Sequence, residues 1–385
     1  MNSSISLFQL FKVFLTIGST SFGGYTALIS FVQRKLVEQY QWLTEEDVID
    51  GVTVASILPG PLAVNVVAYI GYKLKGWGGV AVSMVAVLLP SFLMMILAAE
   101  LYVRYNELEM VQRVISGILL VICAIIASVV FKMSKNNIKS FWQIIIAGIS
   151  FIALFFSSSY WLIIAMILVG GMAGVFFSKK SFTSDIRKHK ETGAWKGILV
   201  IITTAILLVV AIQEEVLIQL TSVFAKASLT LFGGGYVMIP VLHQLVVIDH
   251  HWLTSESFSV AISLGQMTPG PILVSATYVG YLVKGLSGAI VSTIAIFLPS
   301  ALLMIIVSER MDRVKSNPYI QKALTGIRPV IIGLIGFSFI IIFQSQDFTL
   351  LRLAMVLVAT VLLIFARVNE FLLILVFGCL GAIIF

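Results

Sequence analysis

Two Pro-Gly-Pro steps are the segments of this chain that could do chemistry: Pro59-Gly60-Pro61 and Pro269-Gly270-Pro271. Two prolines around a glycine cannot continue an α-helix, so each step predicts a break in the chain. A helix that restarts at the second proline leaves its next backbone N–H groups without partners. Such a helix N-terminus carries about half a positive charge and binds anions. The steps therefore predict a backbone anion site, and the alternative is a plain turn at a membrane surface.

Glycine clusters lie upstream of both steps, inside apolar runs. A mid-span glycine weakens a helix and marks a bend or the close approach of another helix. Close packing is the default interpretation. The functional alternative is that these glycines expose backbone amides to a bound anion. The cluster residues are Gly23 and Gly24 after Phe22, and Gly233, Gly234 and Gly235 after Phe232.

Three polar residues near these segments are further candidates for binding an anion. Asn65 follows the first step and Gln266 precedes the second. Either amide could orient an oxyanion, or could satisfy carbonyl groups that the prolines leave free. Lys226 lies in an apolar run without an acidic residue, so it either contributes a buried cation to an anion path or extends toward a lipid headgroup.

Residues for enzymatic or metal chemistry do not form a pattern. Cys123 and Cys379 lie inside apolar runs without a neighbouring base. His243, His250 and His251 have no acidic residue at metal-ligand spacing. The sequence therefore predicts no catalytic residue, no metal and no cofactor, and the protein is not expected to be an enzyme.

Composition identifies the solvent of these segments as lipid. The chain has 385 residues, of which 59% are hydrophobic and 11% charged, and its mean hydropathy is +1.06. The formal charge of +7 is gathered in short segments between apolar runs, which sets membrane orientation and does not indicate a nucleic-acid partner. With about 20 residues per crossing, the expected spans are 5–33, 77–99, 111–131, 140–157, 160–177, 197–213, 216–242, 286–308, 323–343, 349–366 and 369–385.

An internal duplication relates the two halves of the chain. A shift of 210 positions superposes the Phe-Gly-Gly motifs, the Trp-Leu-Thr motifs at Trp42 and Trp252, and the two Pro-Gly-Pro steps. After one residue of slippage, a shift of 209 superposes Pro90-Ser91 on Pro299-Ser300. Within each half, Thr44 and Thr254 precede acidic residues and are expected to be helix N-caps.

Loop charges favour opposite insertion of the two halves. Lys132, Lys135 and Lys139 make one loop basic, whereas its counterpart, 344–349, contains only Asp347 as a charged residue. Cytoplasmic loops are the basic ones. We therefore expect an all-α polytopic membrane protein with two inverted-topology repeats of about six helices. The repeats are 1–177 and 216–385, joined by 178–215, a basic cytoplasmic loop plus a linking transmembrane helix.

The Pro-interrupted stretches, 46–75 and 256–284, leave the number of crossings open. If each stretch crosses once, the chain crosses thirteen times and the repeats are inverted. If each is a re-entrant hairpin, the count falls to eleven and the repeats become parallel. The first interpretation is preferred.

These motifs resemble the chromate ion transporter (CHR) family, whose members carry Phe-Gly-Gly, Trp-Leu and Pro-Gly-Pro motifs in each half. The resemblance covers nearly the whole chain and is to the long, fused form. It implies a cell-membrane carrier that exports chromate, a small inorganic oxyanion, with sulfate as an isostere. The first half departs from the family's Gly-Gly-Pro, because this chain has Gly23-Gly24-Tyr25. The alternatives are a carrier for sulfate or another oxyanion, including an uptake protein, and a membrane scaffold without cargo. A homo-oligomer is compatible with all three.

Overall fold

The computed structural model describes residues 5–22, 24–157, 159–178, 214–232, 235–309, 317–345, 349–366 and 368–385. Within these ranges every regular element is a helix, and five helices are long and apolar enough to cross a membrane. The chain is thus an all-α polytopic membrane protein, as its composition predicts. The expected linking helix, 197–213, and most of the basic loop before it lie outside the described residues.

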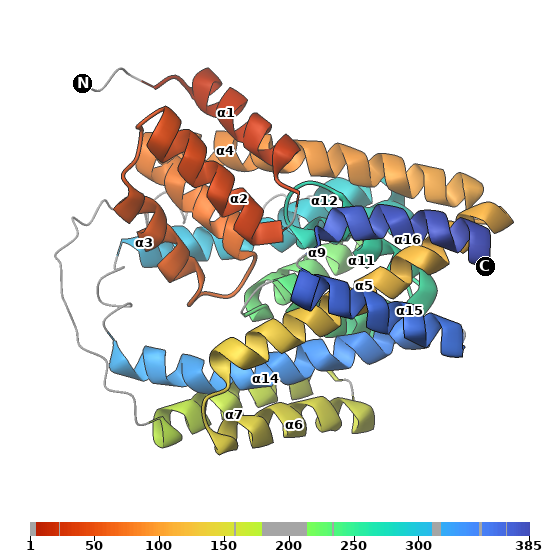
Figure 1. Cartoon of the computed structure of the whole chain (residues 1–385). Coiled ribbons are helices and arrows are strands. Elements are labelled where there is room, and N and C mark those ends of the chain that lie inside the picture. The colour runs from red at the N-terminus through yellow and green to blue at the C-terminus, as the bar shows by residue number, and fades with distance from the viewer. Residues whose placement is uncertain are drawn as a thin grey trace. The chain divides into compact units, whose positions relative to one another are not determined.

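The helices follow the expected spans closely, except that both glycine clusters break a span in two. The first half contains α1 (Leu7–Thr20), α2 (Gly24–Val32), the π-helical turn η1 (Gln33–Gln39), α3 (Glu45–Ala55), α4 (Leu62–Tyr105), α5 (Glu109–Asn137), α6 (Phe141–Phe156) and α7 (Tyr160–Phe177) (Figure 1). The second half contains α9 (Glu215–Thr230), η2 (Gly235–Val237), α10 (Met238–Leu242), η3 (His243–Asp249), α11 (Ser255–Met267), η4 (Ile272–Val274), α12 (Ser275–Ser308), α14 (Pro318–Gln344), α15 (Leu350–Val361), η5 (Leu362–Ala366) and α16 (Glu370–Ile384).

Two compact units share these helices, and each takes segments from both halves of the sequence. Unit 1 comprises Met1–Leu97, Phe182–Gly235 and Thr268–Asn317. Unit 2 comprises Ala98–Ser181, Tyr236–Met267 and Pro318–Phe385. Both Pro-Gly-Pro steps therefore belong to unit 1.

Backbone irregularities recur at the offset that relates the two halves. Gln41 and His251 both have a positive φ, of 53° and 52°. Gly60 and Gly270 have φ values of 105° and 109°. Gly76 in α4 and Gly285 in α12 interrupt their helices with nearly identical dihedral angles. The duplicated sequence is thus accompanied by the same local backbone.

The first expected span, 5–33, is a helical hairpin. Near the start of α1, Leu7 lies beside Gly78, and Gly18 packs on the backbone of Val87, so α1 runs along α4. The chain turns after α1 and enters α2. Just after α2, Gln33 donates a hydrogen bond of 3.3 Å to Glu45, the first residue of α3. The start of α3 lies beside Lys73 of α4, close in sequence to Gly78, where α1 begins. The segment α2 therefore carries the chain back to the end from which α1 started.

The first Pro-interrupted stretch, 46–75, is a second hairpin, which corrects the preferred single crossing. Asp47 near the start of α3 forms a salt bridge with Lys73, and Gly51 packs against the ring of Tyr69. Contacts that pair early residues of one helix with late residues of the next require antiparallel helices. The Pro-Gly-Pro step is therefore the tip of a hairpin whose two ends lie together, which is the re-entrant alternative.

Each of α4 and α12 folds back sharply at its Lys-Gly step. In α4, a Cβ on Gly71 would lie 2.6 Å from the carbonyl oxygen of Gly79, and in α12 Gly280 faces Gly288 in the same way. Thr277 and Thr293 hydroxyls hydrogen-bond across the second turn at 2.7 Å. Small residues allow this approach, and the long remainder of each helix is free to span the bilayer.

Unit 2 is a bundle in which glycines bring helices into backbone contact. Gly117 of α5 packs on Gly381 of α16, and Gly170 and Gly174 of α7 pack on Gly326 of α14. Lipid gives helices no hydrophobic drive to associate, so such close packing is a main source of stability.

The tight turn in α4 gives the first prediction. Gly71→Leu places a side chain where a Cβ would lie 2.2 Å from Ser83 Oγ, so we expect a destabilisation of about 1 to 3 kcal/mol. Gly148→Leu in α6 is the matched control, because nothing lies within 4 Å of its Cβ position. Size-exclusion elution and thermal unfolding in detergent measure the difference, and equal behaviour of the two variants would contradict the packing.

The ion pair at the base of the second hairpin gives a pH prediction. Burial alone raises the pKa of the Asp47 carboxyl, but hydrogen bonds from Lys73 and from Thr44 lower it more, so the pKa lies below its ordinary value. A carboxyl with a lowered folded-state pKa stabilises the protein above its unfolded pKa, and this contribution disappears as the pH falls through the folded value. The difference in melting temperature between wild type and Asp47→Asn should therefore shrink between about pH 6 and about pH 3. A difference in melting temperature that stays constant over this pH range would refute the stabilising role of the Asp47–Lys73 ion pair.

Candidate functional site

Each Pro-Gly-Pro break is hydrogen-bonded to the glycine-cluster break of the other half. The Gly60 amide donates to the Leu231 carbonyl at the end of α9, at 2.6 Å. The Gly270 amide donates to the Ser21 carbonyl at the end of α1, at 3.0 Å. These reciprocal bonds satisfy carbonyl groups that the ends of α1 and α9 would otherwise leave unpaired.

A third contact joins the two breaks of the second half. A Cβ on Gly235 would lie 2.1 Å from the side chain of Ile272, the first residue after Pro271. The second-half breaks are therefore in direct contact, and the bonds from Gly60 and Gly270 attach the first-half breaks to them. We call these four breaks the break cluster; the described residues that join them are Ser21, Gly60, Leu231, Gly235, Gly270 and Ile272.

The break cluster lies near the middle of the long helices of unit 1. Ser91, in the central part of α4, donates its hydroxyl to the Pro269 carbonyl. Ser300, in the long second part of α12, is the neighbour of Gly60, with its Cβ 2.2 Å from the position a Gly60 Cβ would take. Each tip thus packs against a long apolar helix well away from its ends, as a site deep in the bilayer requires.

The backbone amides without partners follow the second proline of each step, as expected, and the glycine amides are not among them. The amides of Gly60 and Gly270 are occupied by the reciprocal bonds. The helices begin at Leu62 and Ile272, one residue later than expected, because Pro271 is extended with ψ of 137°. The amides that the described residues leave without partners are those of the first turns: Leu62, Ala63, Val64, Ile272 and Leu273.

Asn65 is fully buried one turn after the first step. Its Nδ2 donates to the Pro59 carbonyl at 3.2 Å, so it satisfies a carbonyl freed by the prolines, one of its two expected roles. Its Oδ1 has no partner among the described residues. Ser275, which follows Pro271 at the same spacing, donates its hydroxyl to the Ile272 carbonyl at 2.7 Å.

The expected polar site residues have different surroundings. Lys226 is exposed on α9, so it is not the buried cation that one interpretation of the sequence expected. Gln266 is half-buried at the end of α11, two residues before Thr268, and its Nε2 has no partner among the described residues. Gly24 begins α2, whereas Gly23, Gly233 and Gly234 lie outside the described residues.

Ser91 and Ser300 were not recognised as site residues from the sequence. Both are fully buried and each contacts the Pro-Gly-Pro tip of the other half. The Pro-Ser step that contains each of them is repeated at the offset of 209, and this repetition was the available signal. It did not indicate which segment the hydroxyl would contact.

Comparison with known proteins identifies the family. The sequence profile described as "Chromate transporter" matches residues 8–175 and 218–382, one segment in each half of the chain. The chain belongs to the chromate transporter family. This family consists of transporters and not of enzymes, and its matched segments contain all four breaks of the cluster.

Relatives of this transporter align over most of its length. It is 31% identical to the chromate transport protein of Cupriavidus metallidurans over 370 residues, which cover 95% of this chain and 90% of the relative. It is 30% identical to a probable chromate transport protein of Synechococcus elongatus over 89% of this chain and 86% of that one. An uncharacterized transporter of Methanocaldococcus jannaschii is 28% identical over 98% of this chain and 94% of its own length. No solved structure matches the chain.

The contact between Gly60 and Ser300 gives a prediction for the transporter. Gly60→Ala places a methyl group on the Ser300 side chain at a φ of 105°, so we expect loss of transport and lower stability. Adding Ser300→Gly removes the clashing atoms and should restore part of both. Gly76→Ala is the control, because it combines a positive φ with no atom within 4 Å. Equal damage from Gly60→Ala with and without Ser300→Gly would show that this contact is unimportant.

Proposed function

We propose that this transporter exports chromate from the cytoplasm, accepts sulfate as a second substrate, and binds the anion at the break cluster. Family membership supports the substrate class. The single structural observation that carries the proposal is the reciprocal bonding of Gly60 to Leu231 and Gly270 to Ser21, which gathers four chain breaks in one unit.

The free first-turn amides of α4 and η4 suit a tetrahedral dianion. Helix N-termini offer N–H donors and partial positive charge without a desolvated lysine in hydrocarbon. Chromate and sulfate have nearly the same shape and charge, so backbone donors bind both. The unpaired Oδ1 of Asn65 would accept a hydrogen bond from a bound water or from a protonated oxyanion.

We propose further that the two halves are inserted with opposite orientation. The two hairpins of the first half return to their starting side, which leaves the long part of α4, α5, α6 and α7 to cross. Because 5–33 is a hairpin as well as 46–75, each half loses two crossings, and the repeats do not become parallel. The first two crossings, by α4 and α5, place the segment from Lys132 to Lys139 on the N-terminal side, where its charge agrees with a cytoplasmic location. The crossings by α6 and α7 return the chain to that side. One further crossing by the expected helix at 197–213 would then start the second half from the opposite side.

Transport by inside-out membrane vesicles tests the proposed function. Under an imposed gradient, inside-out vesicles with the wild-type protein should accumulate chromate. Export from the cell corresponds to movement into such vesicles. Sulfate should compete with chromate for this accumulation. Gly270→Ala places a methyl group at a φ of 109° and against the Ser91 hydroxyl, so it should reduce accumulation about tenfold. Gly148→Leu should transport as the wild type does.

The same assay separates the alternatives. Accumulation only in right-side-out vesicles would indicate an uptake protein, and preference for sulfate over chromate would indicate a sulfate carrier. Folded protein that transports neither anion in either orientation would indicate a scaffold and would refute the proposal.

A further inference from the structure

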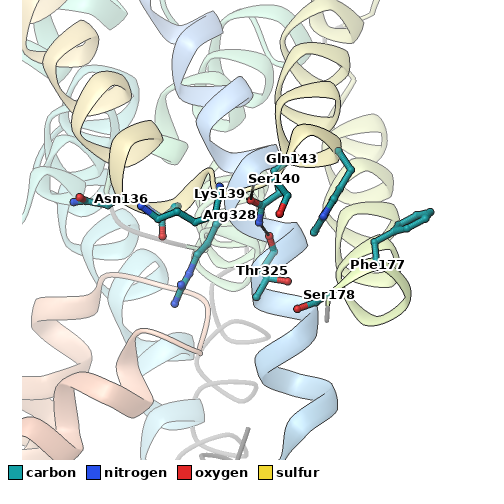
Figure 2. Close-up of a pocket in the computed structure, with 10 residues that line it drawn as sticks. Asn136, Lys139, Ser140, Gln143, Phe177, Ser178, Thr325 and Arg328 are labelled. Atoms are coloured by element: carbon teal, nitrogen blue, oxygen red, sulfur yellow. Dashed lines mark hydrogen bonds between the residues drawn. The ribbon is translucent and has the colours of Figure 1, made fainter. Parts of the chain in front are cut away.

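Unit 2 contains a cavity of about 510 Å³, with a mixed polar and apolar lining, at the junction of the α5–α6 loop with α6, α7 and α14. Figure 2 shows its lining residues, with Lys139 and Arg328 where the loop passes α14. Asparagine, serine and threonine side chains form much of the remaining wall. The cavity lies in a different unit from the break cluster, and none of its lining residues belongs to that cluster.

Two cations line the cavity, and none of the described residues beside them is an aspartate or glutamate. Lys139 Nζ donates to the Lys135 carbonyl at 2.9 Å, and within the described part of the chain neither Lys139 nor Arg328 forms an ion pair. Two uncompensated positive charges in a concave polar site favour binding of an anion.

Gln143 holds this wall of the cavity in place. Its Oε1 accepts hydrogen bonds from the backbone amides of Lys139, at 2.7 Å, and Ser140, at 3.1 Å. Its Nε2 donates to the Thr325 carbonyl of α14 at 3.0 Å. One buried side chain thus ties the α5–α6 loop to the helix that carries Arg328, so the backbone segments that bear the two cations are held together.

The surroundings of the cavity indicate the headgroup layer of the cytoplasmic leaflet. The end of α5 and the loop after it are basic, with Lys132 and Lys135 in the last turns of α5 and Lys139 in the loop. Trp142 and Phe177 also line the cavity, with ring centroids 6.0 Å apart. Aromatic rings of this kind are enriched at the membrane–water interface.

The duplication does not repeat this pair of cations. At the offset of 209, Lys139 of the first half corresponds to Phe348, and Arg328 of the second half corresponds to Leu119. A transport path built from the duplicated motifs would be expected to recur in both halves, so this positive site has a different role.

We propose that this cavity binds a phosphate group, with Arg328 as a bidentate donor and Lys139 as the second cation. Guanidinium matches the geometry of phosphate oxygens, and ammonium adds a point charge. The phosphate comes either from the headgroup of an anionic phospholipid or from the cytoplasm as a free ion. Because the chemistry is shared, the two sources must be separated by experiment.

Binding to the delipidated full-length protein in detergent tests the site. Phosphatidylglycerol, phosphatidylcholine and inorganic phosphate are titrated separately, with melting temperature and native mass spectrometry as readouts. We expect saturable stabilisation by phosphatidylglycerol or by inorganic phosphate, and none by phosphatidylcholine. Stabilisation by phosphatidylglycerol alone identifies a lipid site, and stabilisation by phosphate alone identifies a free-ion site.

Variants localise the binding. Arg328→Gln and Lys139→Gln should each weaken it roughly fivefold. Lys12→Gln removes the same charge from an exposed position of α1 and should leave it unchanged. Variants must elute as monodisperse protein before titration, and Arg328→Lys provides a milder change if Arg328→Gln does not fold. Binding that is unaffected by both cavity variants, or the absence of binding by either anion, would overturn the proposal.

Discussion

The structure of unit 1 depends on one constraint: a broken helix inside a bilayer must find partners for its free backbone groups, because lipid offers none. This chain meets the requirement by pairing break with break. The carbonyls that end α1 and α9 are satisfied by the glycine amides of the opposite Pro-Gly-Pro tips. In both bonds the donor and the acceptor come from different halves, so each half satisfies a break of the other.

This pairing also determines which backbone amides remain without partners in the described part of the chain. The glycine amides hold the tips in place, and the proline nitrogens carry no hydrogen. What is left is the first turn after each step, beginning at Leu62 and Ile272. The glycines are therefore required for close packing at a positive φ, as their contacts with Ser300 and Ser91 show, and the residues after them carry the donors.

The two units divide the chemistry of the transporter. Unit 1 contains backbone donors at breaks that occur at matching positions in both halves of the sequence. Unit 2 is a glycine-packed bundle with a cavity lined by Lys139 and Arg328. The binding that we propose at the two places has different physical origins: helix-end dipoles in the first, and full charges near the headgroup layer in the second.

The sequence by itself determined much of this protein. Apolar runs fixed the membrane environment and most of the helices, and the paired prolines fixed where the chain must break, because both are local properties. The caps at Thr44 and Thr254 were predicted for the same reason and are confirmed by their bonds to Asp47 and Ser257. The duplication was visible because identical motifs recur at a constant offset.

Only the tertiary structure decided what each break contacts. Nothing local distinguishes a hairpin from a crossing in 46–75, since both need the same two helices and the same turn. The salt bridge between Asp47 and Lys73 joins the two ends of this stretch and so identifies the hairpin. The cross-half bonds of Gly60 and Gly270, and the roles of Ser91 and Ser300, join residues far apart in the chain. Such contacts depend on how the two halves interlock, which no window of sequence contains.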